Sequence, residues 1–217
     1  MTTATAVDPE DRASTESTVQ LLYRRLAPVY DLVYGLGLHH GRQLALERLA
    51  PAKGQRICEV GVGTGLSALG YPRDCHVVGL DLSEAMLKRA KKRIARRGLS
   101  QIALCRMDAG RLAFRDGHFD AVYCAYVINV VPDPIAVARE LARACRPGGR
   151  LVFLNHFADG PGHRGVVDRW LGRAATRLGG THWDIDLDGF LRGTGLVPRT
   201  VEPVNAGVST LLVCEKP

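Results

Sequence analysis

The sequence predicts a doubly wound α/β fold, in which helices cover both faces of a mostly parallel sheet. Three observations carry this prediction. Short apolar runs that are typical of buried strands alternate with amphipathic helical segments. One of these runs leads into a glycine-rich turn at residues 61–65. The last two runs, 196–204 and 208–215, flank Asn205-Ala206-Gly207, which predicts an antiparallel hairpin at the C-terminal end of the sheet.

The composition is that of a globular protein with an excess of basic residues. Of the 217 residues, 46% are hydrophobic, which is enough to build a full core. The net charge of +7 and the pI near 9.3 favour an anionic partner: nucleic acid, an acidic lipid surface or a phosphorylated substrate. The longest apolar run, 121–131, is too short to span a bilayer, and no signal peptide is visible.

Six cysteines are scattered through the chain without a Cys-x-x-Cys pair. They are Cys58, Cys75, Cys105, Cys124, Cys145 and Cys214. Several of them lie in apolar, strand-like runs. We therefore interpret them as small buried hydrophobic residues in a reducing compartment.

Three segments divide the chain. Residues 1–16 are polar and predict a flexible N-terminus. Residues 17–50 contain helical patterns interrupted by Pro28, and they predict an N-terminal helical cap. Residues 51–217 carry the alternating strands and helices. This part contains a long segment at 156–180, which we interpret as a lid-like insertion, a membrane-contacting element or a plain crossover helix.

The glycine-rich turn predicts the ligand site. Residues 57–60 form a short buried strand, after which Gly61, Gly63 and Gly65 allow a tight turn and a close approach of a ligand to the backbone. Residues 66–70 are expected to begin a helix whose free N–H groups face the same place. The sequence therefore predicts a nucleotide-like ligand over this loop.

A second strand, residues 75–81, ends in a carboxylate that lies twenty positions after Gly61. A carboxylate at the end of this strand can accept hydrogen bonds from both ribose hydroxyls of a nucleoside. Asp81 is therefore predicted to bind the ribose.

The helix after Asp81 is predicted to begin at Ser83, as N-cap, and to end at Gly98. Its buried side is expected to comprise Leu87, Ala90 and Ile94. The remaining positions are basic: Lys88, Arg89, Lys91, Lys92, Arg93, Arg96 and Arg97. They form either a solvated face or a surface for an anionic partner.

The later elements continue the alternation. Residues 102–109 are expected to form a third strand and a turn, and residues 119–125 a fourth strand. Asp133-Pro134 predicts the start of a helix, with Asp as N-cap and Pro at the first helical position. Residues 146–150 are expected to end that helix and to lead into a fifth strand at 151–154. A short helix is predicted at residues 187–192.

Four features stand in register along the chain: Glu59-x-Gly-x-Gly-x-Gly65, Asp81, Met107-Asp108-Ala109, and the Phe119-Asp120 strand with its Arg146-Pro147-Gly148-Gly149 turn. Together they resemble class I S-adenosylmethionine-dependent methyltransferases over about residues 20–217. The segments Ala27–Tyr34, Glu59–Gly65, Val130–Pro134 and Asn155–Phe157 are similar to bacterial phosphatidylethanolamine N-methyltransferases.

The resemblance implies a Rossmann-like sheet and S-adenosylmethionine as cofactor, with no metal. It also implies a cytoplasmic enzyme that associates peripherally with the inner face of the cell membrane. Such an enzyme binds an anionic membrane surface and a phospholipid substrate. It methylates the amine of phosphatidylethanolamine in up to three steps toward phosphatidylcholine.

The cofactor-binding residues expected from the resemblance are Tyr30, Glu59, Gly61, Gly63, Gly65, Asp81, Leu82, Met86, Met107, Asp108, Ala109 and Ala125. Asp108 is expected to accept a hydrogen bond from the adenine amino group, with Met107 against the ring. The expected substrate-binding residues are Tyr23, Tyr34, Tyr126, His156, Arg164, Arg169 and Arg173. Tyrosine faces attract the quaternary ammonium, and arginines bind the lipid phosphate. His156, Tyr30 or water takes the proton that the amine loses.

Two other kinds of function remain open. A relative that methylates a quinone-ring carbon or another small acceptor would share every cofactor motif. The alternative to an enzyme is a noncatalytic protein that binds the cofactor or a nucleic acid. Ala125-Tyr126-Val127 replaces the Pro-Pro-aromatic turn of amino-directed DNA methyltransferases, and the Pro-Cys nucleophile of cytosine-carbon enzymes is absent from the sequence. No nucleic-acid partner is therefore expected.

Overall fold

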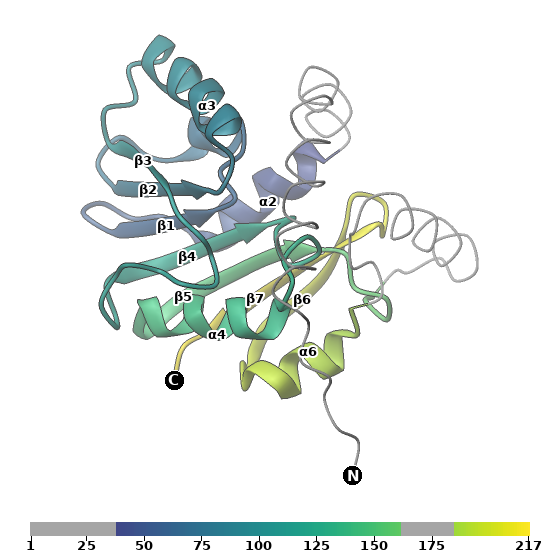
Figure 1. Ribbon diagram of the computed structural model, residues 1–217. Coiled ribbons are helices and arrows are strands. Elements are labelled where there is room, and N and C mark those ends of the chain that lie inside the picture. The colour runs from purple at the N-terminus through teal and green to yellow at the C-terminus, as the bar shows by residue number, and fades with distance from the viewer. Residues whose placement is uncertain (1–37, 162–184) are drawn as a thin grey trace, which may run out of the picture.

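A single sheet organises the computed structural model, which describes residues 38–161 and 185–217 (Figure 1). Within these ranges the strands are β1 Arg56–Val60, β2 His76–Asp81, β3 Ile102–Arg106, β4 Phe119–Ala125, β5 Cys145–Asn155, β6 Pro198–Val204 and β7 Ser209–Glu215. The helices are α2 His39–Leu49, the 3₁₀-helix η1 Ser67–Gly70, α3 Glu84–Arg96, α4 Pro134–Ala144 and α6 Leu187–Thr194. The predicted site residues Tyr23, Tyr30, Tyr34, Arg164, Arg169 and Arg173 lie outside the described residues.

The strand order is β3-β2-β1-β4-β5-β7-β6. The neighbours from β3 to β5 pair in parallel, and β7 pairs antiparallel with both β5 and β6. The order reverses between β1 and β4, which is where open sheets of this kind bind their ligands. The predicted doubly wound sheet with a C-terminal antiparallel hairpin is therefore confirmed.

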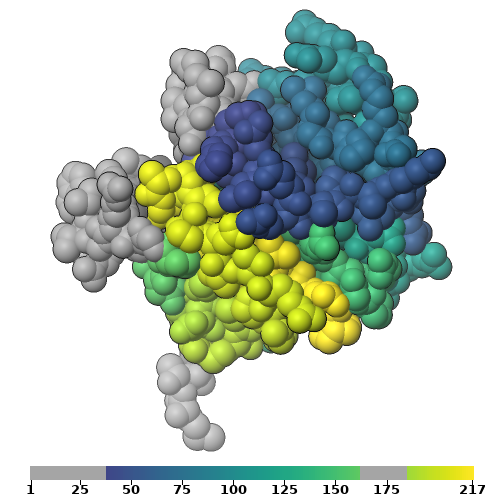
Figure 2. All heavy atoms as spheres, turned by 180° about the vertical axis from the view of Figure 1, so that it is seen from behind, coloured from purple at the N-terminus to yellow at the C-terminus, as the bar shows by residue number. Residues whose placement is uncertain are grey.

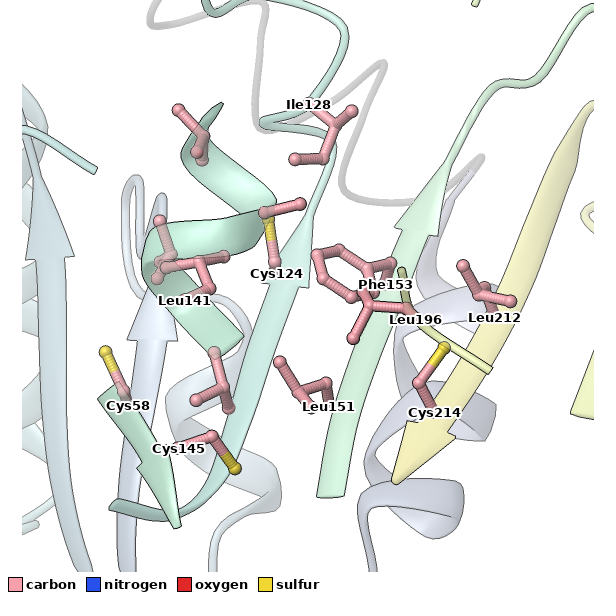
Figure 3. Packing of buried hydrophobic residues seen from close by; sticks show 14 of the residues in the cluster. Cys58, Cys124, Ile128, Leu141, Cys145, Leu151, Phe153, Leu196, Leu212 and Cys214 are labelled. Atoms are coloured by element: carbon pink, nitrogen blue, oxygen red, sulfur yellow. The ribbon is translucent and has the colours of Figure 1, made fainter. Parts of the chain in front are cut away.

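Helices cover both faces of the sheet. On one face, α4 and α6 pack over a core that includes Phe119, Leu141 and Phe153, and Figure 3 shows Leu141 and Phe153 among the side chains of this core. On the other face, Leu46 of α2 and Ile94 of α3 belong to a second core. The two cores follow from the alternation of side chains along each strand, since neighbouring strand residues point to opposite faces.

Four of the cysteines, Cys58, Cys124, Cys145 and Cys214, belong to the core beneath α4 and α6 (Figure 3). All six cysteines are free thiols, and Cys105 is half-buried. Burial raises the pKa of Cys124 and of Cys214 to about 12. These thiols are therefore protonated at neutral pH, as expected of small buried hydrophobic residues.

Helix α2 is joined to the C-terminal hairpin. Figure 2 shows atoms of α2, in purple, beside atoms of the hairpin, in yellow. The Gly41 N–H donates to Asn205 Oδ1 at 3.0 Å, and Arg48 Nε donates to Glu202 Oε1 at 2.8 Å. The hairpin turn therefore lies close to the start of α2, although the two are far apart in the sequence.

Most element boundaries agree with the sequence-based predictions. Ser83 accepts a hydrogen bond from Met86 N at the start of α3, and Asp133 accepts one from Ala136 N at the start of α4. Gly98 has a positive φ of 60°, in keeping with the expected end of α3.

Three expectations were wrong. The segment after the glycine turn forms only the four-residue 3₁₀-helix η1, so it supplies no long helix end over the ligand loop. Met86 takes the buried position of the first turn of α3, whereas Leu87 is only half-buried. Strand β5 begins at Cys145, because residues 146–149 bulge out between two paired positions of the strand.

Strand register brings the ends of neighbouring strands together. Val60 of β1 pairs with Leu80 of β2 on one side and with Cys124 of β4 on the other. The next residue of each strand or loop is Gly61, Asp81 or Ala125, so these three meet at one edge of the sheet. Among the described helices, none has the length and apolar character needed to cross a membrane.

Candidate functional site

A pocket lies at the carboxyl ends of β1 and β4. Five of the predicted site residues line it: Glu59, Gly61, Gly63, Ala125 and Tyr126. Residues that were not predicted complete the lining, among them Arg42 from α2, Thr64 from the glycine turn and Ser67 from η1. The pocket therefore combines the predicted ligand loop with one wall that comes from the N-terminal helix.

Gly61 shows why this turn needs glycine. Its φ is +69°, in the left-handed region that favours glycine. A Cβ built on Gly61 would lie 2.1 Å from Cγ2 of Val127, in the turn after β4. The absence of a side chain thus lets the β1 and β4 turns approach each other at the bottom of the pocket.

Asp81 is bound to the same turn. Its Oδ2 accepts a hydrogen bond from Gly63 N at 2.9 Å, and its Oδ1 accepts one from Ser83 N at 2.8 Å. Burial raises the pKa of Asp81, and these backbone donors counteract part of that effect. The carboxylate therefore anchors the glycine turn as well as the start of α3.

Arg93 of α3 supports the turn from the opposite side. Its Nη1 donates to the carbonyl oxygen of Thr64, and also to Thr64 Oγ1 at 2.9 Å. One member of the basic face of α3 is thus turned inward and holds the ligand loop. The interpretation of that face as a purely solvent-facing or partner-facing surface was wrong for Arg93.

Glu59 carries a buried carboxyl at the back of the pocket, with 3% of the residue exposed. Burial raises its pKa to about 7, and the nearby hydroxyls of Ser67 and Tyr71 and the charge of Arg42 offset only part of this effect. Its Oε2 makes no hydrogen bond to the described residues. Such an atom is costly to bury unless a ligand supplies the partner.

Tyr126 forms the side wall of the pocket. The guanidinium carbon of Arg42 lies 5.2 Å from the centre of the Tyr126 ring, within the range of a cation–π contact. The Tyr126 hydroxyl accepts a hydrogen bond from Asn205 Nδ2 at 2.9 Å. Burial raises the pKa of Tyr126, so the phenol is neutral at physiological pH.

His156 lies next to this wall. Its ring centre is 5.7 Å from that of Tyr126, and only 7% of the residue is exposed. The His156 backbone N–H donates to Asn129 Oδ1 at 3.0 Å, and Asn129 Nδ2 donates to the His156 carbonyl at 2.9 Å. The imidazole Nδ1 contacts the Val208 carbonyl, which can only accept, so Nδ1 carries a hydrogen; in the neutral ring Nε2 then carries the lone pair.

The remaining predicted cofactor residues lie around this edge of the sheet. Met107 N donates to the Asp81 carbonyl at 3.3 Å, which places the turn after β3 next to the end of β2. In that turn Asp108 is exposed and its Oδ1 accepts from Gly110 N, while Ala109 is half-buried. Of the others, Gly65 packs on Ala90 of α3, Leu82 is exposed at the end of β2, and Met86 is buried.

Sequence reasoning missed Arg42, Arg93 and Asn205. Arg42 shares a helical face with Ala45, Leu46 and Leu49, and an arginine on an otherwise apolar face is a signal that the sequence does contain. Asn205 was seen only as a turn residue. The inward direction of Arg93 has no local signal, since its neighbours in sequence are basic too.

Comparison with known proteins agrees with this geometry. The family described as "Methyltransferase domain" matches residues 58–153. A phosphatidylethanolamine N-methyltransferase of Cereibacter sphaeroides is 40% identical over 158 residues, which are 72% of this chain and 77% of that protein. A demethylmenaquinone methyltransferase of Renibacterium salmoninarum is 35% identical over 163 residues, which are 72% of this chain and 66% of the relative.

Solved structures share the fold. The [4+2]-cyclase SpnF superposes with a TM-score of 0.75 at 22% identity, covering 94% of this chain and 97% of that one. Geranyl diphosphate C-methyltransferase from Streptomyces coelicolor, solved with S-adenosyl-L-homocysteine, gives a TM-score of 0.68 at 16% identity, covering 82% and 75%. These likenesses concern the fold alone. Taken with the sequence relatives and the glycine-loop pocket, they place the chain in one family: it belongs to the class I S-adenosylmethionine-dependent methyltransferases.

Proposed function

We propose that this methyltransferase transfers methyl groups to the amine of phosphatidylethanolamine, stepwise toward phosphatidylcholine. The observation that carries the proposal is the 40% identity to a phosphatidylethanolamine N-methyltransferase over most of both chains. The basic charge of the protein is consistent with a substrate that is embedded in an acidic lipid surface.

The residues of the pocket fit S-adenosylmethionine. The glycine turn leaves room for a ligand, and the unpartnered Oε2 of Glu59 provides an acceptor for an ammonium group. Asp81 accepts backbone hydrogen bonds from Gly63 N and Ser83 N, and a carboxylate with about four lone-pair sites keeps acceptor capacity for a ribose hydroxyl. We assign Glu59 to the amino-acid part of the cofactor and Asp81 to its ribose.

S-adenosylmethionine supplies an electrophilic methyl group on a positively charged sulfur. Because methyl transfer is an in-line displacement, the main task of the protein is to position the acceptor and exclude water. The wall formed by Tyr126 and His156 stands beside the cofactor pocket and is suited to this task.

The acceptor amine must lose a proton before it attacks. In the neutral imidazole of His156, Nε2 carries the lone pair needed to accept it, since Nδ1 donates to the Val208 carbonyl. Tyr126 is unsuited as a base because its raised pKa keeps the phenol protonated. We propose His156 for this role, with Tyr30 or water as the alternatives that the sequence leaves open.

Arg42 restricts how Tyr126 can serve the substrate. One face of the Tyr126 ring already carries the Arg42 cation, so only the other face can attract an ammonium group. We therefore propose that Tyr23, Tyr30 and Tyr34 provide most of the aromatic contact. The phosphate is assigned to Arg164, Arg169 and Arg173. These six residues lie outside the described part of the chain, and their roles rest on the sequence.

Membrane association is the second part of the proposal. Helix α3 presents exposed basic side chains, namely Lys88, Lys91, Lys92, Arg96 and Arg97. Lys88 pairs with Glu84 on the same helix at 2.8 Å. The others are available to a surface of acidic lipid headgroups on the cytoplasmic side.

A quinone-directed activity is the second candidate. It is favoured by the relatives that are named demethylmenaquinone methyltransferases, such as the one at 35% identity. Such an acceptor reacts through a ring carbon and has no phosphate, so it would gain little from the arginines of the 156–180 segment.

We predict that Asp81→Asn lowers the affinity for S-adenosylhomocysteine about 10- to 100-fold, because a charge-assisted acceptor for the ribose is lost. The matched ligand is the 2′,3′-dideoxy analogue, for which calorimetry should show a much smaller loss. Asp74→Asn, at an exposed site, serves as the control. Equal losses for both ligands would show that Asp81 only supports the Gly63 turn.

We predict a pH-dependent gain in stability for Glu59→Gln. In the folded protein the pKa of Glu59 is about 7, against 4.5 in the unfolded chain, so the free energy of unfolding falls as pH rises from about 4.5 to 7. Removing the carboxyl should raise the free energy of unfolding at pH 8 by up to about 3 kcal/mol, with little change at pH 4.5. Urea unfolding across this range checks it. Glu47→Gln, on the exposed side of α2, is the control, and parallel curves for wild type and Glu59→Gln would contradict the assignment.

We predict salt-sensitive binding to acidic vesicles. The double variant Lys91→Glu/Lys92→Glu should weaken vesicle binding at least tenfold, since each basic side chain near an acidic surface contributes about 1 kcal/mol. Lys53→Glu/Arg115→Glu makes the same change of charge at the amino ends of β1 and β4, and it should have a smaller effect. Co-sedimentation with phosphatidylglycerol-containing and neutral vesicles gives the measurement. Equal loss in both variants would point to net charge rather than to α3.

We predict that the wild-type protein transfers labelled methyl groups to phosphatidylethanolamine vesicles and yields mono-, di- and trimethylated lipid. Demethylmenaquinone in neutral vesicles should remain unlabelled. Arg164→Ala/Arg169→Ala/Arg173→Ala should abolish lipid methylation and leave the affinity for S-adenosylhomocysteine unchanged, because these arginines are assigned to the lipid phosphate. Label in the quinone alone would favour the second candidate.

A further inference from the structure

Arg42 reaches the cofactor pocket from a helix that the cofactor motifs do not include. It lies on the face of α2 that packs on the sheet, and only 9% of the residue is exposed. Together with Glu59 and the glycine turn it lines the pocket. Burial of a charge costs free energy unless charged or polar groups compensate for the lost hydration. Arg42 therefore brings a positive charge to the lining of the pocket.

A chain of contacts sets the position of Arg42. Its guanidinium stacks over the Tyr126 ring, whose hydroxyl is held by Asn205 Nδ2 at 2.9 Å. The same Asn205 side chain accepts from Gly41 N at 3.0 Å, one residue before Arg42. A Cβ on Gly41 would lie 2.6 Å from Asn205 Nδ2, so a larger residue here would displace the Asn205 amide. Asn205 thus fixes both the start of α2 and the aromatic ring on which Arg42 rests.

The pocket presents two opposite charges beside the glycine turn. Arg42 lowers the pKa of Glu59 against the effect of burial, so its charge acts on the carboxyl at the back of the pocket. The Glu59 Oε2 atom lacks a hydrogen-bond partner among the described residues. A ligand with an ammonium and a carboxylate group on neighbouring atoms matches such a pair of charges.

We propose that Arg42 binds the carboxylate of the methionine part of S-adenosylmethionine, while Glu59 binds its ammonium. A guanidinium can donate two parallel hydrogen bonds to a carboxylate from its edge while its face stacks on an aromatic ring. Arg42 and Glu59 then select cofactors that carry an intact amino acid. The inference rests on the cofactor of the family and is independent of the methyl acceptor.

Calorimetry with two ligands tests the assignment. S-adenosylhomocysteine and 5′-methylthioadenosine share the nucleoside and the sulfur, but only the first carries the amino acid. Arg42→Gln should weaken binding of S-adenosylhomocysteine tenfold or more and change the affinity for methylthioadenosine less than twofold. Arg48→Gln on the exposed side of the same helix should change neither affinity. Equal losses for both ligands, or no loss, would overturn the proposal.

A second measurement needs no variant. The wild-type protein should bind the carboxamide of S-adenosylhomocysteine at least tenfold more weakly than the free acid, because the amide has no negative charge. Equal affinity for the acid and the amide would overturn the proposal even if Arg42→Gln failed to fold. Neither experiment contains a lipid or a quinone. A failure here is therefore distinct from a failure of the proposed lipid activity.

Discussion

The Asp81 carboxylate is the interaction on which the pocket depends. One side chain binds the backbone of the glycine turn at Gly63 and the start of α3 at Ser83, and it stands at the end of β2. Two N–H donors stabilise the charged form and offset part of the cost of its burial. Arg93 completes the arrangement from α3 by binding Thr64. The ligand loop is thus held by hydrogen bonds from its neighbours, and the short η1 helix contributes little to its position.

The other wall of the pocket depends on the C-terminal hairpin. The β6–β7 turn brings Asn205 against Gly41 and Tyr126, and so joins α2 to the turn after β4. Asn205 of this turn binds Gly41 and Glu202 of β6 binds Arg48, so the hairpin lies beside α2. The last strands of the chain therefore help to shape a site whose motif lies near residue 60.

The sequence predicted strands and helix ends correctly where an interaction between neighbouring residues decides the structure. The buried strands and the caps at Ser83 and Asp133 were found, because apolar runs and capping residues act over a few positions. The errors came where packing decides between similar local choices. Met86 and Leu87 are adjacent apolar residues, and only Met86 is buried in the folded chain. Residues 66–70 were expected to begin a helix, yet the chain leaves the 3₁₀ conformation at Tyr71, which is buried.

Short motifs are enough to predict the sheet, the cofactor loop and the carboxylate at the end of β2, because each depends on residues that lie close together in the chain. Tertiary structure alone decided that Arg42, Tyr126 and Asn205 share one wall of the pocket. These residues come from a helix, a turn and a hairpin, and the Gly41–Asn205 bond joins positions 164 residues apart. No local pattern records such a meeting, since it arises only when strand register brings the ends of distant elements to the same edge of the sheet.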